Sequence, residues 1–229
     1  MIPWTLIDTG KIPGTEDTLR LMQRGTEFSI MLGGNQLMNS RLSGSEVALA
    51  TLACARTADR PARKILIGGL GMGFTLRAAL TVAGAKATIV VAELVPAVIA
   101  WAQGPLSSLF GDALGDPRVD LRQADVVEVI RAKKAFYDAI LLDVDNGPEG
   151  LTRSANDRLY HAAGLADAYA ALRPGGVLAV WSGGPDDAFT QRLRRAGFVA
   201  EDIAVRATGA RKGARHRIWL ATRPASRSQ

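Results

Sequence analysis

The sequence is poor in the residues that build disulfide frameworks and metal centres. It holds one cysteine, Cys54, and two histidines, His161 and His216, which lie far apart in the chain. A single cysteine excludes an internal disulfide framework and is typical of a reducing compartment. Two distant histidines without cysteine partners do not match the ligand spacing of a zinc site. We therefore expect no metal.

Long hydrophobic runs are also missing. No stretch approaches the roughly 20 apolar residues that a membrane-spanning helix needs. The start, Met1-Ile-Pro-Trp4, lacks the basic residues and the apolar run of a signal peptide. The expectation is a cytoplasmic protein with no membrane partner. With 229 residues, 48% of them hydrophobic, the chain suits a single domain with a sizeable core.

The charge is positive, with a net value of +6. Much of the excess lies near the C-terminus, at Arg206, Arg211, Lys212, Arg215, Arg217, Arg223 and Arg227. A basic patch can bind nucleic acid or acidic substrates. No Phe, Trp or Tyr interleaves residues 206–217, so a base-stacking surface is not indicated there. A solvated loop and tail is the simpler interpretation, and a nucleic-acid partner is left open but not favoured.

The most informative segment is Lys64-Ile-Leu-Ile-Gly-Gly-Leu-Gly-Met-Gly-Phe74. It predicts a buried strand, a tight glycine turn and a helix, and such a turn lets backbone approach a ligand closely. Gly69, Gly71 and Gly73 give the spacing G-x-G-x-G, whereas the dinucleotide fingerprint would need its third glycine at Phe74. The loop resembles that of S-adenosylmethionine-type transferases more than that of nicotinamide enzymes. A glycine turn without a ligand is the alternative.

From residue 64 onward strands and helices alternate. Strands are expected at 65–67, 87–93, 119–123, 137–142, 177–181, 198–206 and 217–222, and a helix of about 15 residues ends before Arg173. This order predicts an α/β fold, a doubly wound, seven-stranded, mostly parallel Rossmann-like sheet of the methyltransferase type with an antiparallel last strand. Residues 1–42 are expected to form a small N-terminal β-hairpin region, 43–224 the nucleoside-binding domain and 225–229 a tail.

Acidic residues follow several of these strands, at the edge where open α/β sheets bind ligands. Glu93 ends the second strand and can accept hydrogen bonds from both hydroxyls of a ribose. Asp125 follows the third strand and can accept the adenine amino group or merely cap the next helix. Asp143 and Asp145 follow the fourth strand beside an Asn-Gly-Pro turn, where they are candidates for chemistry or, as the alternative, turn-forming residues.

Taken together, these segments resemble the spermidine synthase family of aminopropyltransferases, on the class I methyltransferase fold. The resemblance rests on Ile67-Gly-Gly-Leu-Gly-Met-Gly73, Glu93, Asp116-Pro-Arg-Val119, Asp125, Tyr137-Asp-Ala-Ile-Leu-Leu-Asp143 and Leu159-Tyr160. It implies a function in polyamine biosynthesis, with decarboxylated S-adenosylmethionine as co-substrate and a small-molecule amine as acceptor. It also implies a homodimer, with Leu32, Leu37 and Met38 as candidate contacts.

The same resemblance implies a role for each candidate residue. The glycine loop, with Gly69, Gly71 and Gly73, would hold the donor. Glu93 would bind its ribose and Asp125 its adenine. Asp143 would act as general base, with Asp145 beside it in the same loop. Gln36, Glu46 and Tyr160 would contact the amine substrate.

Four positions depart from the family pattern. Gly71 stands where the family's loop has an aspartate that holds the amino group of the decarboxylated donor, and Val95 stands where an acid is usual. Gly44-Ser45-Glu46 replaces Tyr-His-Glu, so only the glutamate remains. These departures leave two alternatives open. One is an S-adenosylmethionine-dependent methyltransferase of a small molecule or nucleic acid, and the other is a catalytically degenerate binding scaffold. Aminopropyl transfer is preferred because the loop and the fourth strand match the aminopropyltransferases better than they match the methyltransferases.

Overall fold

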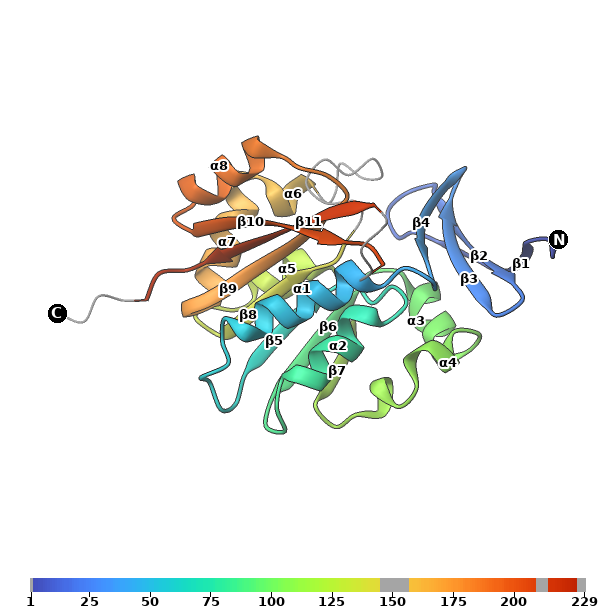
Figure 1. Ribbon diagram of the computed structural model, residues 1–229, viewed down its shortest axis with the longest axis horizontal. Coiled ribbons are helices and arrows are strands. Elements are labelled where there is room, and N and C mark those ends of the chain that lie inside the picture. The colour runs from blue at the N-terminus through green and yellow to red at the C-terminus, as the bar shows by residue number, and fades with distance from the viewer. Residues whose placement is uncertain (1, 145–156, 209–213, 226–229) are drawn as a thin grey trace.

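The computed structural model describes residues 2–144, 157–208 and 214–225, which form two β-sheets and the helices around them (Figure 1). The strands are β1 (Thr5–Lys11), β2 (Thr18–Arg24), β3 (Glu27–Leu32), β4 (Asn35–Asn39), β5 (Lys64–Gly68), β6 (Thr88–Glu93), β7 (Val119–Gln123), β8 (Tyr137–Leu142), β9 (Leu172–Ser182), β10 (Val199–Arg206) and β11 (Arg215–Thr222). The helices are α1 (Gly44–Ala55), α2 (Phe74–Val82), α3 (Pro96–Gln103), α4 (Ser107–Phe110), α5 (Val126–Arg131), α6 (Asp157–Tyr160), α7 (Ala162–Ala171) and α8 (Asp187–Arg195), with a 3-10 turn η1 (Ala113–Gly115).

The larger sheet has seven strands in the order β10-β11-β9-β8-β5-β6-β7. The strands from β9 to β7 in this order are parallel, whereas β11 runs antiparallel to both of its neighbours, β9 and β10. The predicted seven-stranded sheet with an antiparallel last strand is therefore confirmed. Because β11 runs against the parallel strands, its first residues lie at the edge where the parallel strands end.

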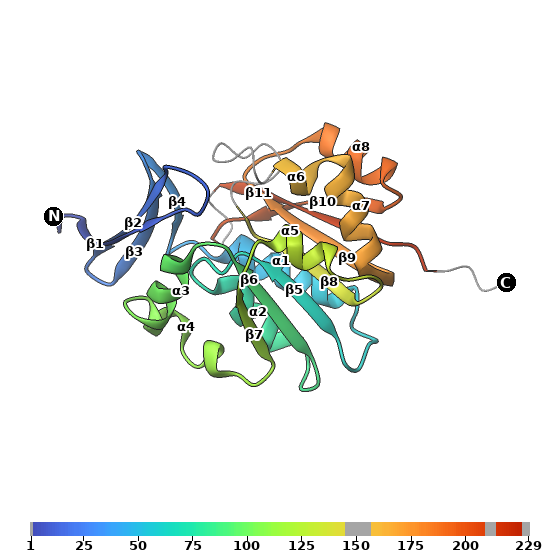
Figure 2. The same ribbon diagram turned by 180° about the vertical axis from the view of Figure 1, so that it is seen from behind.

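Helices cover both faces of this sheet, as Figures 1 and 2 show from opposite sides. Helices α1, α2 and α3 lie on one face, and α5, α7 and α8 lie on the other. Side chains that alternate along a strand point to opposite faces, so each strand contributes to two cores. On β5, Ile65 and Ile67 belong to the core under α1 and α2, and Leu66 belongs to the other core. Burial on both faces explains the near-continuous apolar runs of the central strands.

The N-terminal sheet is antiparallel, with the order β1-β2-β3-β4. The expected small β region is thus present and gains a fourth strand, Asn35–Asn39. The sheet is fixed to α3, where the indole of Trp101 donates a hydrogen bond to Asp8 at 2.7 Å. Gly10 packs so closely on Ala97 that a side chain at this position would collide with it. This docking places the N-terminal sheet over one end of the larger sheet. The division of domains at residue 42 stays a proposal.

Two predicted elements differ from the structure. The single helix of about 15 residues is wrong, because α6 ends at Tyr160 and α7 starts at Ala162. Between them His161 is extended, with φ −81° and ψ 168°, which breaks the helical hydrogen bonding. Strand β9 begins at Leu172 instead of residue 177. The four residues after Leu172 are accommodated by a shift in register against β8, between Tyr137 and Ala139.

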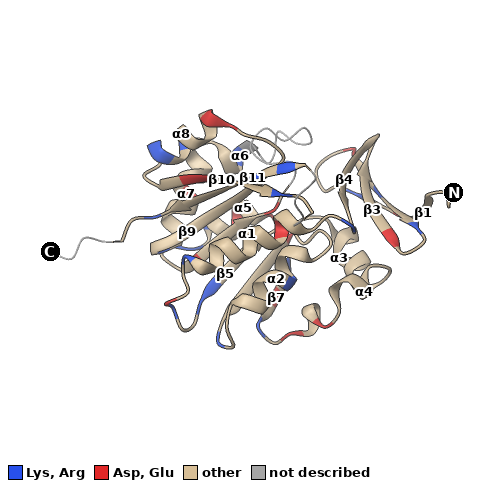
Figure 3. Ribbon diagram, viewed as in Figure 1, with Lys and Arg blue, Asp and Glu red and all other residues tan. Residues whose placement is uncertain are grey.

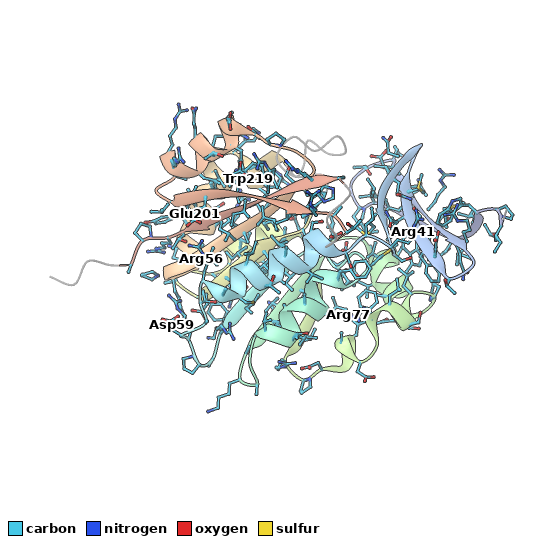
Figure 4. The ribbon with its side chains drawn as sticks, viewed as in Figure 1. Arg41, Arg56, Asp59, Arg77, Glu201 and Trp219 are labelled. Carbon is cyan, nitrogen blue, oxygen red and sulfur yellow. The ribbon has the colours of Figure 1, made fainter. Side chains whose placement is uncertain are left out.

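Charged side chains link distant elements of the fold. Arg56 at the end of α1 donates to both carboxylate oxygens of Glu201 on β10, at 2.9 and 2.7 Å (Figure 4). Figure 3 shows Lys and Arg on several separate elements, among them α8, β5 and β11. Two members of the basic C-terminal set have internal partners, since Arg217 pairs with Asp202 and Arg223 donates to the carbonyls of Tyr169 and Leu172.

The described helices are all too short or too polar to cross a membrane. Among the described residues, no three His, Cys, Asp or Glu side chains gather into a group that could hold a metal ion.

Candidate active site

A cavity of about 380 Å³ lies at the edge of the larger sheet where the parallel strands end. Residues that follow β5, β6, β7, β8 and β9 form its floor, and the N-terminal sheet contributes a wall through Ile12, Leu19 and Ile30. Its polar lining includes Gln36, Glu46, Glu93, Asp125, Asp143 and His216. The fold therefore brings most of the sequence-predicted acids together at one site.

The glycine loop between β5 and α2 forms the centre of this floor. Gly69, Gly71 and Gly73 all have positive φ, at 89°, 50° and 79°, a region that residues with a side chain rarely adopt. A Cβ on Gly69 would collide with the backbone oxygen of Asp143, and a Cβ on Gly73 would collide with the ring of Phe110. The loop thus needs glycine both for its backbone conformation and for its close packing.

Replacing Gly69 with Ala is expected to lower the free energy of unfolding by about 1–3 kcal/mol, because strain at φ 89° adds to the clash with Asp143. Gly34→Ala is the matched control, since Gly34 has open space around its Cα and no positive φ. Urea denaturation of both variants measures the difference. Equal stability of the two variants would contradict this account of the loop.

Glu93 joins the end of β6 to the glycine loop. Its two carboxylate oxygens accept hydrogen bonds from the backbone N–H groups of Leu70, at 2.9 Å, and Val95, at 2.8 Å. Burial raises the pKa of this carboxyl, and the surrounding backbone N–H groups oppose the shift. Each carboxylate oxygen has more than one lone pair, so a ligand hydroxyl in the cavity can still be accepted. Glu93 therefore holds the loop in place and presents an acceptor to the cavity.

Asp125 lies after β7 and lines the same cavity. One of its oxygens accepts a hydrogen bond from the backbone N–H of Val127 at 2.9 Å, which makes it the N-cap of α5. Its other oxygen lies 3.6 Å from a guanidinium nitrogen of Arg158. The structure thus confirms the alternative in which Asp125 caps the next helix. Contact with a ligand stays a prediction beside it.

Asp143 follows β8 and faces the start of α2. Its carboxylate accepts a 2.6 Å hydrogen bond from the hydroxyl of Thr75, and its backbone N–H donates to Gly68 at 3.0 Å. Burial, and then the nearby carboxylate of Glu46, raise the pKa of Asp143 from 3.8 to about 7, and the Thr75 hydroxyl partly offsets the rise. A carboxyl group with a pKa near neutrality can accept and release protons under physiological conditions.

The raised pKa of Asp143 predicts how stability depends on pH. The folded protein binds a proton up to about pH 7, whereas an unfolded aspartate releases it near 3.8. This contribution to stability is therefore complete below pH 3.8 and is lost as the pH rises through 7. Relative to Asp143→Asn, which does not titrate, the wild type should lose at most about 4 kcal/mol between pH 4 and pH 8. Urea denaturation at several pH values measures this, and parallel curves would contradict it.

Three hydrogen-bonded polar residues lie together near the cavity, Ser45 and Glu46 from α1 and His216 from β11. The Ser45 hydroxyl lies 2.7 Å from a carboxylate oxygen of Glu46, and Nδ1 of His216 lies 2.9 Å from the same hydroxyl. The ring of His216 packs edge-on against Trp181, with the ring centroids 4.8 Å apart. Burial raises the pKa of Glu46 and lowers that of His216, so both shifts favour the neutral forms. Neither His216 nor Trp181 was among the residues predicted from sequence.

Comparison with known proteins relates the chain to one group of enzymes. No family model matches the chain. A polyamine aminopropyltransferase of Mycobacterium tuberculosis (strain CDC 1551 / Oshkosh) is 33% identical over 127 residues, which are 54% of this chain and 23% of that protein. Over this stretch the chain is similar to a polyamine aminopropyltransferase. It spans about a quarter of the length of that relative.

Solved structures show that the fold is that of these aminopropyltransferases. The spermidine synthase of Thermotoga maritima matches with a TM-score of 0.73 at 20% identity, over 96% of this chain and 74% of that one. A spermidine synthase in complex with the transition-state analogue AdoDATO matches with a TM-score of 0.71 at 20% identity, over 96% and 73% of the two chains. The predicted fold and the predicted family resemblance are thereby confirmed.

At position 71, where the aminopropyltransferase pattern has an acid, the structure places a methionine side chain next to the glycine. A Cβ there would lie 3.0 Å from the methyl carbon and 3.1 Å from the sulfur of Met38, which comes from β4. Met38 therefore occupies space that a side chain at position 71 would need. Leu37 and Met38 both line the cavity. A dimer through these residues stays a prediction.

Three further residues predicted from the aminopropyltransferase resemblance have different outcomes. Gln36 lines the cavity and donates a 2.8 Å hydrogen bond to Ser29. Tyr160 is buried edge-on against Phe189 and is not among the described residues that line the cavity, so its contact with substrate stays a prediction. Asp145 lies outside the described residues.

Proposed function

We propose that the chain is a transferase that binds an S-adenosyl sulfonium donor in this cavity and moves an aminopropyl group to an amine, with Asp143 as general base. The observation that carries the proposal is the position of Asp143. Its carboxylate lies beside the glycine loop, is held by Thr75 and has a pKa raised to about 7. Similarity to the aminopropyltransferases supports the reaction class, and the residue roles are part of the proposal.

The residues of the cavity fit an S-adenosyl donor. Gly69 and Gly71 line the cavity, and Glu93 offers carboxylate oxygens for the ribose hydroxyls. Leu94 and Val126 give apolar walls on which an adenine base can pack, with Asp125 next to them. Carboxylates around the cavity also offset the positive charge of a sulfonium.

The chemistry requires a base because the attacking amine is mostly protonated at neutral pH. In the proposed step, Asp143 removes a proton from the ammonium group, and the nitrogen lone pair attacks the aminopropyl carbon next to sulfur. A nitrogen–carbon bond forms, the carbon–sulfur bond breaks and sulfur keeps the electron pair, which leaves neutral methylthioadenosine. The positive charge thus moves from sulfur to the new secondary ammonium. A cationic donor close to Asp143 also favours its ionised form.

Gly71 supports methyl transfer as a second candidate function. Intact S-adenosylmethionine carries a carboxylate that an acid in the loop would repel, and this loop has none between Gly68 and Phe74. Met38 occupies the space next to Gly71 instead. In this alternative the same cavity holds S-adenosylmethionine, and Asp143 takes a proton from the methyl acceptor.

Calorimetric titration with the two donors tests the choice between these functions. Decarboxylated S-adenosylmethionine and S-adenosylmethionine differ by one carboxylate, so the ratio of their dissociation constants reports how the site treats that charge. The proposal predicts tighter binding of the decarboxylated donor, because the lining acids Glu46 and Asp143 repel a carboxylate. Tighter binding of intact S-adenosylmethionine would favour methyl transfer, and binding of neither by folded protein would contradict both.

A further inference from the structure

The last strand carries a polar group for which the proposed reaction has so far no use. His216 is the second residue of β11 and lies on the same face of the sheet as Ile218, which belongs to the core under α1. Because β11 is antiparallel to β9, this position lies at the ligand edge, and the imidazole lines the cavity. His216, from the C-terminal part of the chain, thus lines the same cavity as residues of the N-terminal sheet.

The hydrogen bonds of this imidazole determine its tautomer. When Glu46 is ionised, the single proton of the Ser45 hydroxyl is donated to its carboxylate, 2.7 Å away. The oxygen of Ser45 must then accept from Nδ1 of His216, 2.9 Å away, so the ring carries its proton on Nδ1. Nε2 is left with a lone pair. In the part of the chain that the structure describes, the bond at Nδ1 is the one hydrogen bond recorded for the ring.

A neutral imidazole in this tautomer is suited to bind an amine. Its Nε2 accepts from N–H, which is the only hydrogen-bonding group that an ammonium presents. Burial lowers the pKa of His216, which favours the neutral ring. The charged groups that line the cavity with it are Glu46, Glu93, Asp125 and Asp143, and Trp181 from β9 packs against its edge. Val205 is its partner on β10.

We propose that His216 binds the attacking amine through Nε2, and that Ser45 and Glu46 are positioning residues that hold the imidazole in the required tautomer. This inference rests on the proposed function and adds the residue that recognises the acceptor. Asp143 and His216 would hold the same amine, the first as a charged proton acceptor and the second as a neutral hydrogen-bond acceptor. The apolar side chains of Trp181 and Leu42, which also line the cavity, would contact the carbon chain of the amine.

Nitrogen-15 NMR of histidine-labelled protein at pH 8 tests the tautomer. The chain has two histidines, and His161→Gln, which alters the exposed histidine before α7, assigns the signals. His216 is expected to be protonated on Nδ1 in the wild type and in His161→Gln, and to shift toward the Nε2-protonated form in Ser45→Ala. An Nε2-protonated ring in the wild type, or a tautomer that does not respond to Ser45→Ala, would overturn the inference.

Addition of 1,4-diaminobutane and, separately, n-butylamine tests the contact with amine. At least one of them is expected to shift the Nε2 signal of His216 and to leave His161 unchanged, and no shift with either would overturn the inference. In turnover assays His216→Gln should raise KM for the amine about tenfold or more, as loss of a hydrogen bond to a charged group predicts, with the Kd of the donor unchanged. If His216 behaves as expected but the protein transfers a methyl group, the proposed function is contradicted and the inference about His216 is not.

Discussion

Replacing Asp143 with Asn is expected to lower kcat by about 10²–10⁴-fold, the contribution typical of a general base. Asparagine keeps the size of the side chain and a carbonyl oxygen that can accept from Thr75, but it cannot take a proton from the amine. The affinity for the donor should change little, because Glu93 and the glycine loop supply its main contacts in the proposed site. Steady-state kinetics with saturating donor, together with calorimetric titration of the donor, measures both quantities.

The control for this variant is Asp112→Asn, which makes the same chemical change at an exposed position before η1. It should leave kcat unchanged. The thermal unfolding of Asp143→Asn must stay cooperative for the result to count. A folded Asp143→Asn protein that turns over at the wild-type rate would exclude Asp143 as the base.

Replacing Asp138 with Ala is expected to lower the free energy of unfolding by about 3–5 kcal/mol, because it removes one partner of a buried ion-pair cluster. The side chain of Asp138 is fully buried near the amino end of β8, at the edge of the sheet opposite to the cavity. It pairs with the guanidinium groups of Arg60 and Arg173, and it accepts from the backbone N–H of Lys64 at 2.7 Å. Urea denaturation measures the loss.

Two comparisons make this stability prediction specific. Asp138→Asn keeps an oxygen for the N–H of Lys64 and should lose less stability than Asp138→Ala, and Asp112→Ala on the surface should change stability by about 0.5 kcal/mol or less. Below its unfolding transition, Asp138→Ala should bind donor as the wild type does, because the cluster lies away from the cavity. A stability within about 0.5 kcal/mol of the wild type would contradict the structural role of Asp138.

Much of the fold was predictable because the central strands are buried on both faces. That burial requires near-continuous apolar runs such as 65–67 and 87–93, which mark each strand in the sequence. The acids Glu93, Asp125 and Asp143 could be placed for the same reason. Each follows a recognisable parallel strand, and the ends of parallel strands meet at one edge of the sheet.

His216 was missed because its strand runs the other way. In an antiparallel strand the first residues, and not the last, lie at the ligand edge, so His216 does not follow the pattern of polar residues after strands. Its signal in the sequence is a histidine directly before the expected last strand, residues 217–222. Trp181 was recognised as part of a strand, but its contact with His216 depends on the register between β9 and β11, which the sequence does not reveal.

The helix break at His161 and the longer β9 depend on tertiary contacts. A Cβ on Gly164 would collide with the backbone oxygen of Arg158, so the two helices pack closely across the break. The residues after Leu172 contain Pro174, Gly175 and Gly176, which favour a turn in isolation. In the structure they continue β9, with Gly175 donating to the carbonyl of Arg223 at 2.8 Å.

The identity of the thioether product tests the central claim most directly. A sulfonium donor loses one of its three substituents, and the group that leaves determines the thioether that remains. Mass spectrometry of a reaction with decarboxylated S-adenosylmethionine and a set of amines should show methylthioadenosine together with an amine that has gained an aminopropyl group, and neither with Asp143→Asn. Formation of decarboxylated S-adenosylhomocysteine, with a methylated acceptor, would contradict aminopropyl transfer.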